Sequence, residues 1–333
     1  MIKFPSVLLL VIAAFAPTAA SAGDQPKAAA PPPAVAPAQM PDTEILVASL
    51  SWRGSRPQLH KPYNATNHKG YDNQPWFLPG ADAFLFVSEG ESGKTDIWRY
   101  DIKSKKRRRL FFSPKVSEYS PRLAPDGARI SYVQENEAGD MTRVSAHSLD
   151  GADEGAPIIN FAPLGYYAWL DGGAALAVYY RSEPARLYRV DIASGDQTLL
   201  YENIGRALQS DATGAHLWFT AAPVDAGANA GGSPPASFTL MRYDSATGSI
   251  AKLFELPAGD EDYAVAFSKS GSPLGVFAAS GGAIYFRTLD ENEGDSAWER
   301  VVELSSAKIG NATRLAVSDD LKWIAIVGAP TAN

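Results

Sequence analysis

Polar, charged and aromatic side chains recur at one position of a repeated pattern in this sequence. They stand at the start of one apolar segment in each repeat. The ten residues are Asp72, Asn73, Gln74, Glu118, Tyr119, Tyr166, Arg206, Asp262, Tyr263 and Arg314. Carboxylates can act as general acids or bases, whereas Tyr and Arg are enriched at the centres of binding surfaces. If the fold brings these positions together, they form one surface that is suited to either chemistry.

Other groups lack the spacing that catalysis or cofactor binding requires. The segment 88–95 (SEGESGKT) approaches the phosphate-binding P-loop, but Ser88 replaces its first Gly, and a strand pattern follows where a helix is needed. The sequence has no G-x-S-x-G elbow of a serine hydrolase. The histidines show no metal-ligand spacing; they are His60, His68, His147 and His216. We therefore predict no catalytic residue, no cofactor and no metal site.

The repeat that carries the ten residues is about 46 residues long in its first copies. Its clearest phrase is YSPRLAPDG at 119–127, which leads into the apolar run 128–133. The equivalent marker positions are Ala81, Gly127, Gly173, Gly214, Gly271 and Leu321. Each marker is expected in a tight turn, where Pro presets φ and Gly supplies a positive φ. Copies of one unit at such a period predict a ring or a solenoid.

Each repeat has the strand content of one propeller blade. Alternating apolar and polar residues after the marker predict half-buried strands at 96–102, 185–192 and 239–244. Turn residues and another short strand pattern follow, so one unit is four antiparallel strands. The fourth repeat is lengthened by 221–236, rich in Ala, Gly and Pro, which is expected to loop out.

The two ends of the chain complete the ring. The last repeat, 314–327, holds only two strand patterns, while 43–50 has the pattern of a third strand and 53–59 can supply a fourth. We therefore predict an all-β, six-bladed β-propeller over 43–333, with blade six shared between N- and C-terminal strands. The first strand of each blade lines the channel, so the ten residues are expected at one mouth. Trp76 and Trp169, further along, are expected in the core between blades.

The phrase SPRLAPDG at 120–127 resembles the repeat of TolB-like propellers, also called WD40-like or PD40 repeats. The resemblance covers about residues 43–328 and is most specific in the first two blades. It implies a propeller fold and suggests a protein partner in the cell envelope. TolB has an α/β domain before its propeller, where this sequence has a short linker, so the resemblance is to the family and not to TolB itself.

The first 42 residues differ in composition from the repeats. Lys3, the apolar stretch 7–15 and Ala20-Ser-Ala22 predict a signal peptide at 1–22, followed by an Ala- and Pro-rich linker at 23–42. The apolar stretch is too short to span a membrane. We therefore expect a periplasmic protein, or a secreted one as the alternative, and not a transmembrane one. The absence of cysteine permits export without disulfides.

The formal net charge of −7 argues against nucleic acid as a partner. One basic run opposes this trend, and it comprises Lys103, Lys105, Lys106, Arg107, Arg108 and Arg109. Such a run predicts a charged outer edge strand that prevents sheets from associating. The alternative is contact with an anionic surface such as lipid headgroups.

Two classes of function fit these observations. The first is a monomeric binding or scaffolding propeller that engages a protein or peptide at the channel mouth. The second is a propeller enzyme of the lactonase, lyase or hydrolase kind, with a carboxylate site in the channel. The inward carboxylates Asp72, Glu118 and Asp262 have no aligned His, which favours binding. A third interpretation is that the ten residues only satisfy strand ends and hold water.

Overall fold

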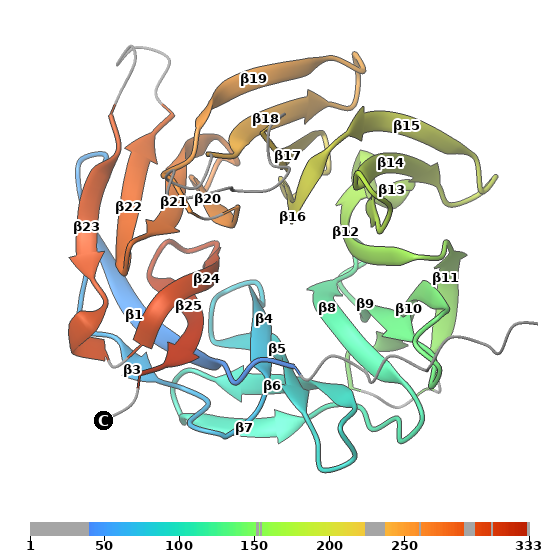
Figure 1. Ribbon diagram of the computed structural model, residues 1–333, viewed down its shortest axis with the longest axis horizontal. Coiled ribbons are helices and arrows are strands. Elements are labelled where there is room, and N and C mark those ends of the chain that lie inside the picture. Colours follow the sequence, from blue (N-terminus) through green and yellow to red (C-terminus); the bar gives the residue numbers. More distant parts are fainter. Residues whose placement is uncertain are drawn as a thin grey trace, which may run out of the picture. The chain divides into compact units, whose positions relative to one another are not determined.

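The computed structural model describes residues 40–331, except 151–152, 154, 224–236, 260, 290–296 and 308. The described residues form six antiparallel sheets arranged as blades in a ring (Figure 1). Every described element is a strand apart from two short 3₁₀ helices, η1 (Asp171–Gly173) and η2 (Ser305–Ala307). The predicted all-β, six-bladed propeller is therefore confirmed. No described helix is long and apolar enough to cross a membrane.

The first three blades follow the repeat order, from the innermost strand outward. Blade one consists of β4 (Asp72–Phe77), β5 (Ala83–Glu89), β6 (Thr95–Asp101) and β7 (Lys106–Arg109). Blade two consists of β8 (Ser117–Leu123), β9 (Arg129–Glu135), β10 (Thr142–Ser148) and β11 (Ala156–Asn160). Blade three consists of β12 (Leu164–Leu170), β13 (Ala175–Tyr180), β14 (Arg186–Asp191) and β15 (Gln197–Glu202).

Blades four and five have the same order, and blade six is assembled from both ends of the chain. Blade four consists of β16 (Ile204–Ser210), β17 (His216–Ala221), β18 (Thr239–Asp244) and β19 (Ile250–Glu255). Blade five consists of β20 (Tyr263–Phe267), β21 (Pro273–Ser280), β22 (Ala283–Thr288) and β23 (Glu299–Glu303). Blade six consists of β24 (Ile309–Val317), β25 (Trp323–Pro330), β1 (Glu44–Arg53) and β2 (Arg56–Leu59), with β3 (Tyr63–Asn64) pairing to β1.

The shared sixth blade closes the ring as predicted. Strand β1 runs antiparallel to β25, in a register that extends from Glu44 opposite Gly328 to Ser49 opposite Trp323. The indole Nε1 of Trp52 donates a hydrogen bond of 3.0 Å to the carbonyl oxygen of Leu321. The same indole packs edge-on against Phe286 of blade five, at 5.6 Å between ring centroids. The N-terminal strand therefore contacts both the last blade and its neighbour.

The apolar core lies in six clusters, one between each pair of neighbouring blades. The alternation of strand side chains explains how one strand serves two interfaces. In β1, Ile45 and Val47 pack toward blade one, whereas Leu46 and Ala48 pack toward blade five. All four side chains are fully buried. Each blade is thus held on both faces by its neighbours.

All six marker positions adopt a positive φ, as the tight turns require. The values are 57° at Ala81, 68° at Gly127, 102° at Gly173, 71° at Gly214, 87° at Gly271 and 60° at Leu321. Ala81 and Leu321 adopt this left-handed conformation without the freedom of Gly, at a cost of about 1 kcal/mol. The turns project from one end of the innermost strands, and they form one border of the cavity described below.

Three sequence predictions concern segments outside the described residues. They are the signal peptide at 1–22, the linker at 23–42 except for its last three residues, and the insertion predicted at 221–236 except for its first three residues, of which Ala221 ends strand β17. The segment 88–95 leads into strand β6, and not into a helix, as the argument against a phosphate-binding loop anticipated. The last four residues of the basic run form β7, which is the outermost strand of blade one, as the prediction of an outer edge strand requires.

Candidate functional site

The innermost strands of blades one and two carry matching bulges. The pairing register shifts between Asn73 and Trp76 in β4, and between Tyr119 and Arg122 in β8. Within each bulge one residue takes a positive φ, 57° at Gln74 and 53° at Ser120. The Gln74 Oε1 accepts a 2.5 Å hydrogen bond from the Ser120 backbone N–H. Bulges redirect side chains, and this pair joins the two blades at that point.

A cavity of about 770 Å³ runs along the innermost strands of all six blades. One part is lined by Tyr166, Arg206, Asp262 and Arg314, which we call the channel network. At its other end the cavity is bordered by exposed residues of the marker turns, including Pro79, Pro125, Ala212, Lys269 and Asp319. The volume lies within the range of ligand-binding pockets in proteins.

Within the channel network, Arg206 joins three blades. Its Nη2 lies 2.5 Å from Asp262 Oδ2 on blade five, and its Nε lies 3.2 Å from Glu261 Oε1. The same Nη2 donates to the carbonyl oxygen of Thr313 on blade six, at 3.2 Å. Burial alone would lower the pKa of Arg206, but the two carboxylates raise that pKa well above its ordinary value. Arg206 therefore remains charged and serves as a crosslink between blades.

Arg314 reaches from blade six to blade three, on the opposite side of the ring. Its Nη2 donates to the Tyr166 hydroxyl oxygen at 3.4 Å, and its guanidinium lies 5.0 Å from the centroid of that ring. This geometry is that of a cation–π contact combined with a hydrogen bond. Side chains therefore cross the channel at the level of the channel network.

Arg122 projects into the cavity from blade two and has no ion pair with any described carboxylate. Its Nη2 donates a 2.8 Å hydrogen bond to the carbonyl oxygen of Leu208 on blade four, and its guanidinium lies 5.8 Å from the Tyr167 ring centroid. Burial lowers the pKa of Arg122, and the positive charge of Arg314 acts in the same direction. The cavity therefore contains a guanidinium whose charge no described acidic group pairs with.

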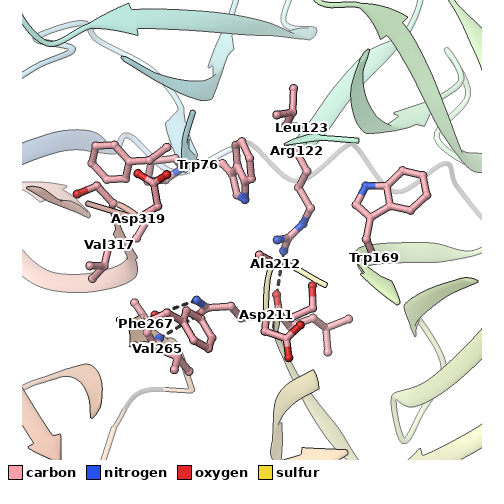
Figure 2. A pocket seen from close by; sticks show the side chains of 18 of the residues that line it. Trp76, Arg122, Leu123, Trp169, Asp211, Ala212, Val265, Phe267, Val317 and Asp319 are labelled. Carbon is pink, nitrogen blue, oxygen red and sulfur yellow. Dashed lines mark hydrogen bonds between the residues drawn. The ribbon is translucent and has the colours of Figure 1, made fainter. Parts of the chain in front are cut away.

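Apolar and aromatic side chains lie nearer the marker turns. We call this set the rim, and it comprises Trp76, Leu123, Trp169, Phe267 and Val317. Figure 2 shows these side chains around one space, with Arg122 projecting between Trp76 and Trp169. The Trp169 indole Nε1 donates to Ser131 Oγ at 3.0 Å, which fixes the orientation of its ring.

The side-chain amide of Gln209, on blade four, links that blade to blade five. It forms two hydrogen bonds to the Val265 backbone, at 3.0 and 2.8 Å.

The structure brings six of the ten predicted residues to the cavity. They are Gln74, Tyr166, Arg206, Asp262, Tyr263 and Arg314. The other four, Asp72, Asn73, Glu118 and Tyr119, do not belong to its lining. Tyr119 instead packs against the core clusters on both sides of blade two.

The two predicted carboxylates that do not reach the cavity are buried between strands. Glu118 accepts hydrogen bonds from Ser113 Oγ at 2.9 Å and from the Ile97 N–H at 3.4 Å. Burial raises its pKa to about 7. Asp72 is fully buried, with His68 Nδ1 at 3.6 Å, and burial raises its pKa to about 6. Both carboxyls are therefore harder to ionise in the folded chain than in water.

The prediction for Trp76 and Trp169 was incomplete. Both indoles pack against inter-blade clusters, as expected, but both also line the cavity. Arg122 and Gln209 were not among the predicted residues. A strand alternates with period two, so the position two residues after Gln74 is Trp76, and the position two after Ser120 is Arg122. The period therefore points to Trp76 and Arg122 once Gln74 and Ser120 are known to face inward, but it does not reach Gln209, which lies three residues after Arg206.

The histidines are engaged with nearby polar groups: His60 with the hydroxyl of Ser51, and the other three with carboxylates. His216 Nδ1 lies 2.9 Å from Asp211, and His147 Nδ1 lies 3.0 Å from Asp153. In the part of the chain that the structure describes, no group of three or more His, Asp or Glu side chains is arranged to hold a metal ion.

The comparisons with known proteins establish the fold. No protein-family model matches the sequence, and no curated protein matches it. Solved structures do match: TolB from Acinetobacter baumannii has 14% identity and a TM-score of 0.52, over 86% of this chain and 64% of that one. A putative TolB from Agrobacterium tumefaciens has 14% identity and a TM-score of 0.61, over 86% and 98%. An oligogalacturonate lyase in complex with manganese has 12% identity and a TM-score of 0.51, over 81% and 80%.

These similarities show that the chain has the propeller fold of the TolB structures, in agreement with the resemblance found in the repeat phrase. At 12–14% identity they concern the fold alone. The chain spans 64% of the length of the Acinetobacter TolB, so it is similar to TolB without matching all of it.

Proposed function

We propose that this protein is an exported, periplasmic binding propeller that takes a segment of a protein or peptide into its central cavity. The observation that carries the proposal is the rim. It places two Trp side chains and one Phe from three different blades around one opening, above a polar interior. Large aromatic residues and Arg are the residue types that dominate binding energy at protein interfaces.

The carboxylates near the cavity support binding over catalysis. Asp262 and Glu261 both lie against Arg206, at 2.5 and 3.2 Å. Burial raises the pKa of Glu261 and the positive charge of Arg206 opposes that rise, but both carboxylates are already engaged by the same guanidinium. This arrangement suits a structural crosslink between blades. Turnover of a bound peptide in the experiment below would instead favour the enzyme.

Selection from a random peptide library tests the binding proposal. We expect peptides that bind the native protein and lose about thirtyfold in affinity with Trp169→Ala, which corresponds to about 2 kcal/mol for a central aromatic residue. The matched control is Trp298→Ala, because Trp298 lies at the outer part of blade five and packs on Phe254. Equal affinity of the native protein and Trp169→Ala, at unchanged melting temperature, would contradict the proposal. So would turnover of a selected peptide, which would favour the enzyme.

Export is tested by the mass of the protein recovered from the cell envelope. We expect a mature chain that begins at Gly23, after the small residues Ala20-Ser-Ala22. Recovery of the uncleaved chain from the cytoplasm alone would remove the periplasmic part of the proposal.

A further inference from the structure

We infer that the cavity selects ligands that carry a carboxylate, and that Arg122 is the residue that receives it. The inference rests on the proposed binding function and adds the chemical class of the bound segment. An acidic side chain or a C-terminal carboxylate of a peptide would satisfy it.

The first observation is the unsatisfied hydrogen-bonding capacity of two guanidinium groups. A guanidinium has five N–H donors in a fixed fork that matches a carboxylate. The Nε atoms of Arg122 and Arg314 are buried, and neither has a hydrogen-bond partner within the described protein. Among the described residues, the one hydrogen bond found for the Arg122 guanidinium goes to the neutral carbonyl oxygen of Leu208. Arg122 also lines the cavity, so the remaining donors of its guanidinium are the ones that a group entering the cavity would meet.

The second observation is the balance of charge inside the cavity. Three arginines line it, on blades two, four and six. The two carboxylates beside them, Asp262 and Glu261, both form ion pairs with Arg206. Arg122 therefore lies in a partly dehydrated space without a counter-charge, which is unfavourable for a cation. A ligand carboxylate would supply the missing charge through strong, charge-assisted hydrogen bonds.

The acidic residues near the marker turns do not fill this role. Asp211 accepts hydrogen bonds from its own turn, including one of 2.7 Å from Thr213 Oγ1. Asp320 pairs with Lys322 at 2.9 Å, and Asp319 accepts from the Gly80 N–H at 3.2 Å. Asp319 is exposed, so water and salt screen its charge, whereas Asp211 and Asp320 already have partners within their own turns. They leave the charge of Arg122 unpaired.

The third observation is the position of Arg122 relative to the rim. Figure 2 shows its guanidinium in the space between Trp76 and Trp169. A ligand that places a carboxylate on Arg122 thus brings its neighbouring groups against indole rings. The preferred ligand therefore combines a carboxylate with an adjacent aromatic or apolar group.

Two small probes test the selectivity without a known partner. They are 3-phenylpropionate and its neutral amide, 3-phenylpropionamide, each titrated into the native protein and followed by NMR. We expect the acid to bind at least tenfold more tightly than the amide, and to bind more weakly as salt is added. In Arg122→Gln the affinity for the acid should fall to the affinity for the amide. Arg122→Lys should retain part of the preference, because it keeps the charge and loses the fork.

Arg129→Gln is the matched control, because Arg129 lies in the same blade, is exposed, and pairs with Asp126. It should leave the preference unchanged. The melting temperature of each variant shows whether a loss of affinity is caused by misfolding. If Arg122→Gln does not fold, the preference of Arg122→Lys for the acid over the amide still tests the inference. Equal binding of the two probes to the native protein overturns the inference, as does an unchanged preference in Arg122→Gln.

The peptide selection separates this inference from the proposed function. Selected peptides enriched in Asp, Glu or a free C-terminus support both. Selected peptides whose affinity is the same for the native protein and Arg122→Gln overturn the inference and leave the binding function intact. Selective binding of the phenyl acid, with no peptide selected, supports the inference and removes the peptide from the proposed function.

Discussion

The innermost and outermost strands of the ring use the same residue type in opposite ways. Outer strand β7 consists of Lys106-Arg-Arg-Arg109, and three of its four residues are exposed. On the inner strands, Arg206 is held by two carboxylates and Arg314 by a tyrosine from the opposite blade. Position within the blade, and not the density of positive charge along the sequence, therefore decides which arginines link blades to one another.

The physical reason is the solvent. At the outer edge, water competes for each charge, so an exposed ion pair contributes about 0–1 kcal/mol. Along the channel, a charge that loses its partner cannot recover its hydration, so removing one member of a buried pair costs several times more. Four predictions measure this contrast, in order of decreasing effect.

Deleting residues 43–51 should remove most of the stability of the fold. The segment contains four large buried apolar side chains, Ile45, Leu46, Val47 and Leu50, besides the smaller Ala48. Burying each contributes about 1.5–3 kcal/mol, and their sum is comparable to the whole net stability of a domain, about 5–15 kcal/mol. Replacing edge strand β2 by Gly-Ser repeats should cost only about 1–2 kcal/mol. Denaturant unfolding measures both, and a deletion that melts within a few degrees of the parent would contradict the shared blade.

Arg206→Ala should cost about 3–5 kcal/mol, because it leaves Asp262 buried without its ion pair. The matched outer pair is Arg186 with Glu202, at 2.9 Å and more than one-third exposed on both sides. Arg186→Ala should cost less than about 1 kcal/mol. Urea unfolding of the two variants tests the comparison directly. Similar losses in both would show that burial does not separate the two kinds of arginine.

Glu118 should make the protein less stable as pH rises from about 4.5 to 7. Burial raises the pKa of this carboxyl from its ordinary 4.5 to about 7, so in this range the folded state holds a proton that the unfolded state has lost. The stability lost by pH 8 is on the order of 2–3 kcal/mol. Asp72 adds a change in the same direction, because burial raises its pKa from 3.8 to about 6.

The measurement for Glu118 is the free energy of unfolding between pH 5 and pH 8, with and without Glu118→Gln. The variant should gain stability relative to the native protein as pH rises. Exposed Glu137, changed to Gln, serves as the control and should leave the profile unaltered. A native profile that rises over this interval would rule out the assigned sign.

Changes on β7 should have the smallest effect. Arg108 is exposed, so Arg108→Ala should alter stability by less than about 0.5 kcal/mol. Lys105 and Arg107 lie over the rings of Tyr63 and Trp98, at 4.6 and 5.5 Å, so replacing either should cost about 0.5–1 kcal/mol. Thermal melting measures these values. Binding to anionic vesicles that disappears with the β7 changes would instead support the lipid-surface alternative for the basic run.

The ring itself could be predicted from the sequence because its signals are local. A turn phrase at a regular period places the markers, and an alternating pattern places the strands. Even the shared blade follows from counting, because 314–327 lacks two strands and 43–59 provides them. All six marker positions have the positive φ that the predicted tight turn requires.

The candidate site could be predicted only in part, because it depends on contacts between distant segments. The repeat places Arg206 and Asp262 at similar positions of two blades, but no pattern reveals that they pair, since they are 56 residues apart. Glu118 and Asp262 both looked like inward carboxylates and both are buried, but only Asp262 lines the cavity. The bulges at Gln74 and Ser120 shift the facing of each strand, and this shift follows from backbone geometry that composition does not encode.

The register of the closing strands determines how the ring would respond to force. Glu44 lies opposite Gly328, so the first residue of β1 and the last residues of β25 are neighbours. Tension applied between residues 40 and 331 would load the hydrogen bonds of this pair one after another, as in opening a zipper, and not all together as in shear. The ring would therefore open first at the blade that closes it, while the other five, each a continuous stretch of chain, would bear the load later.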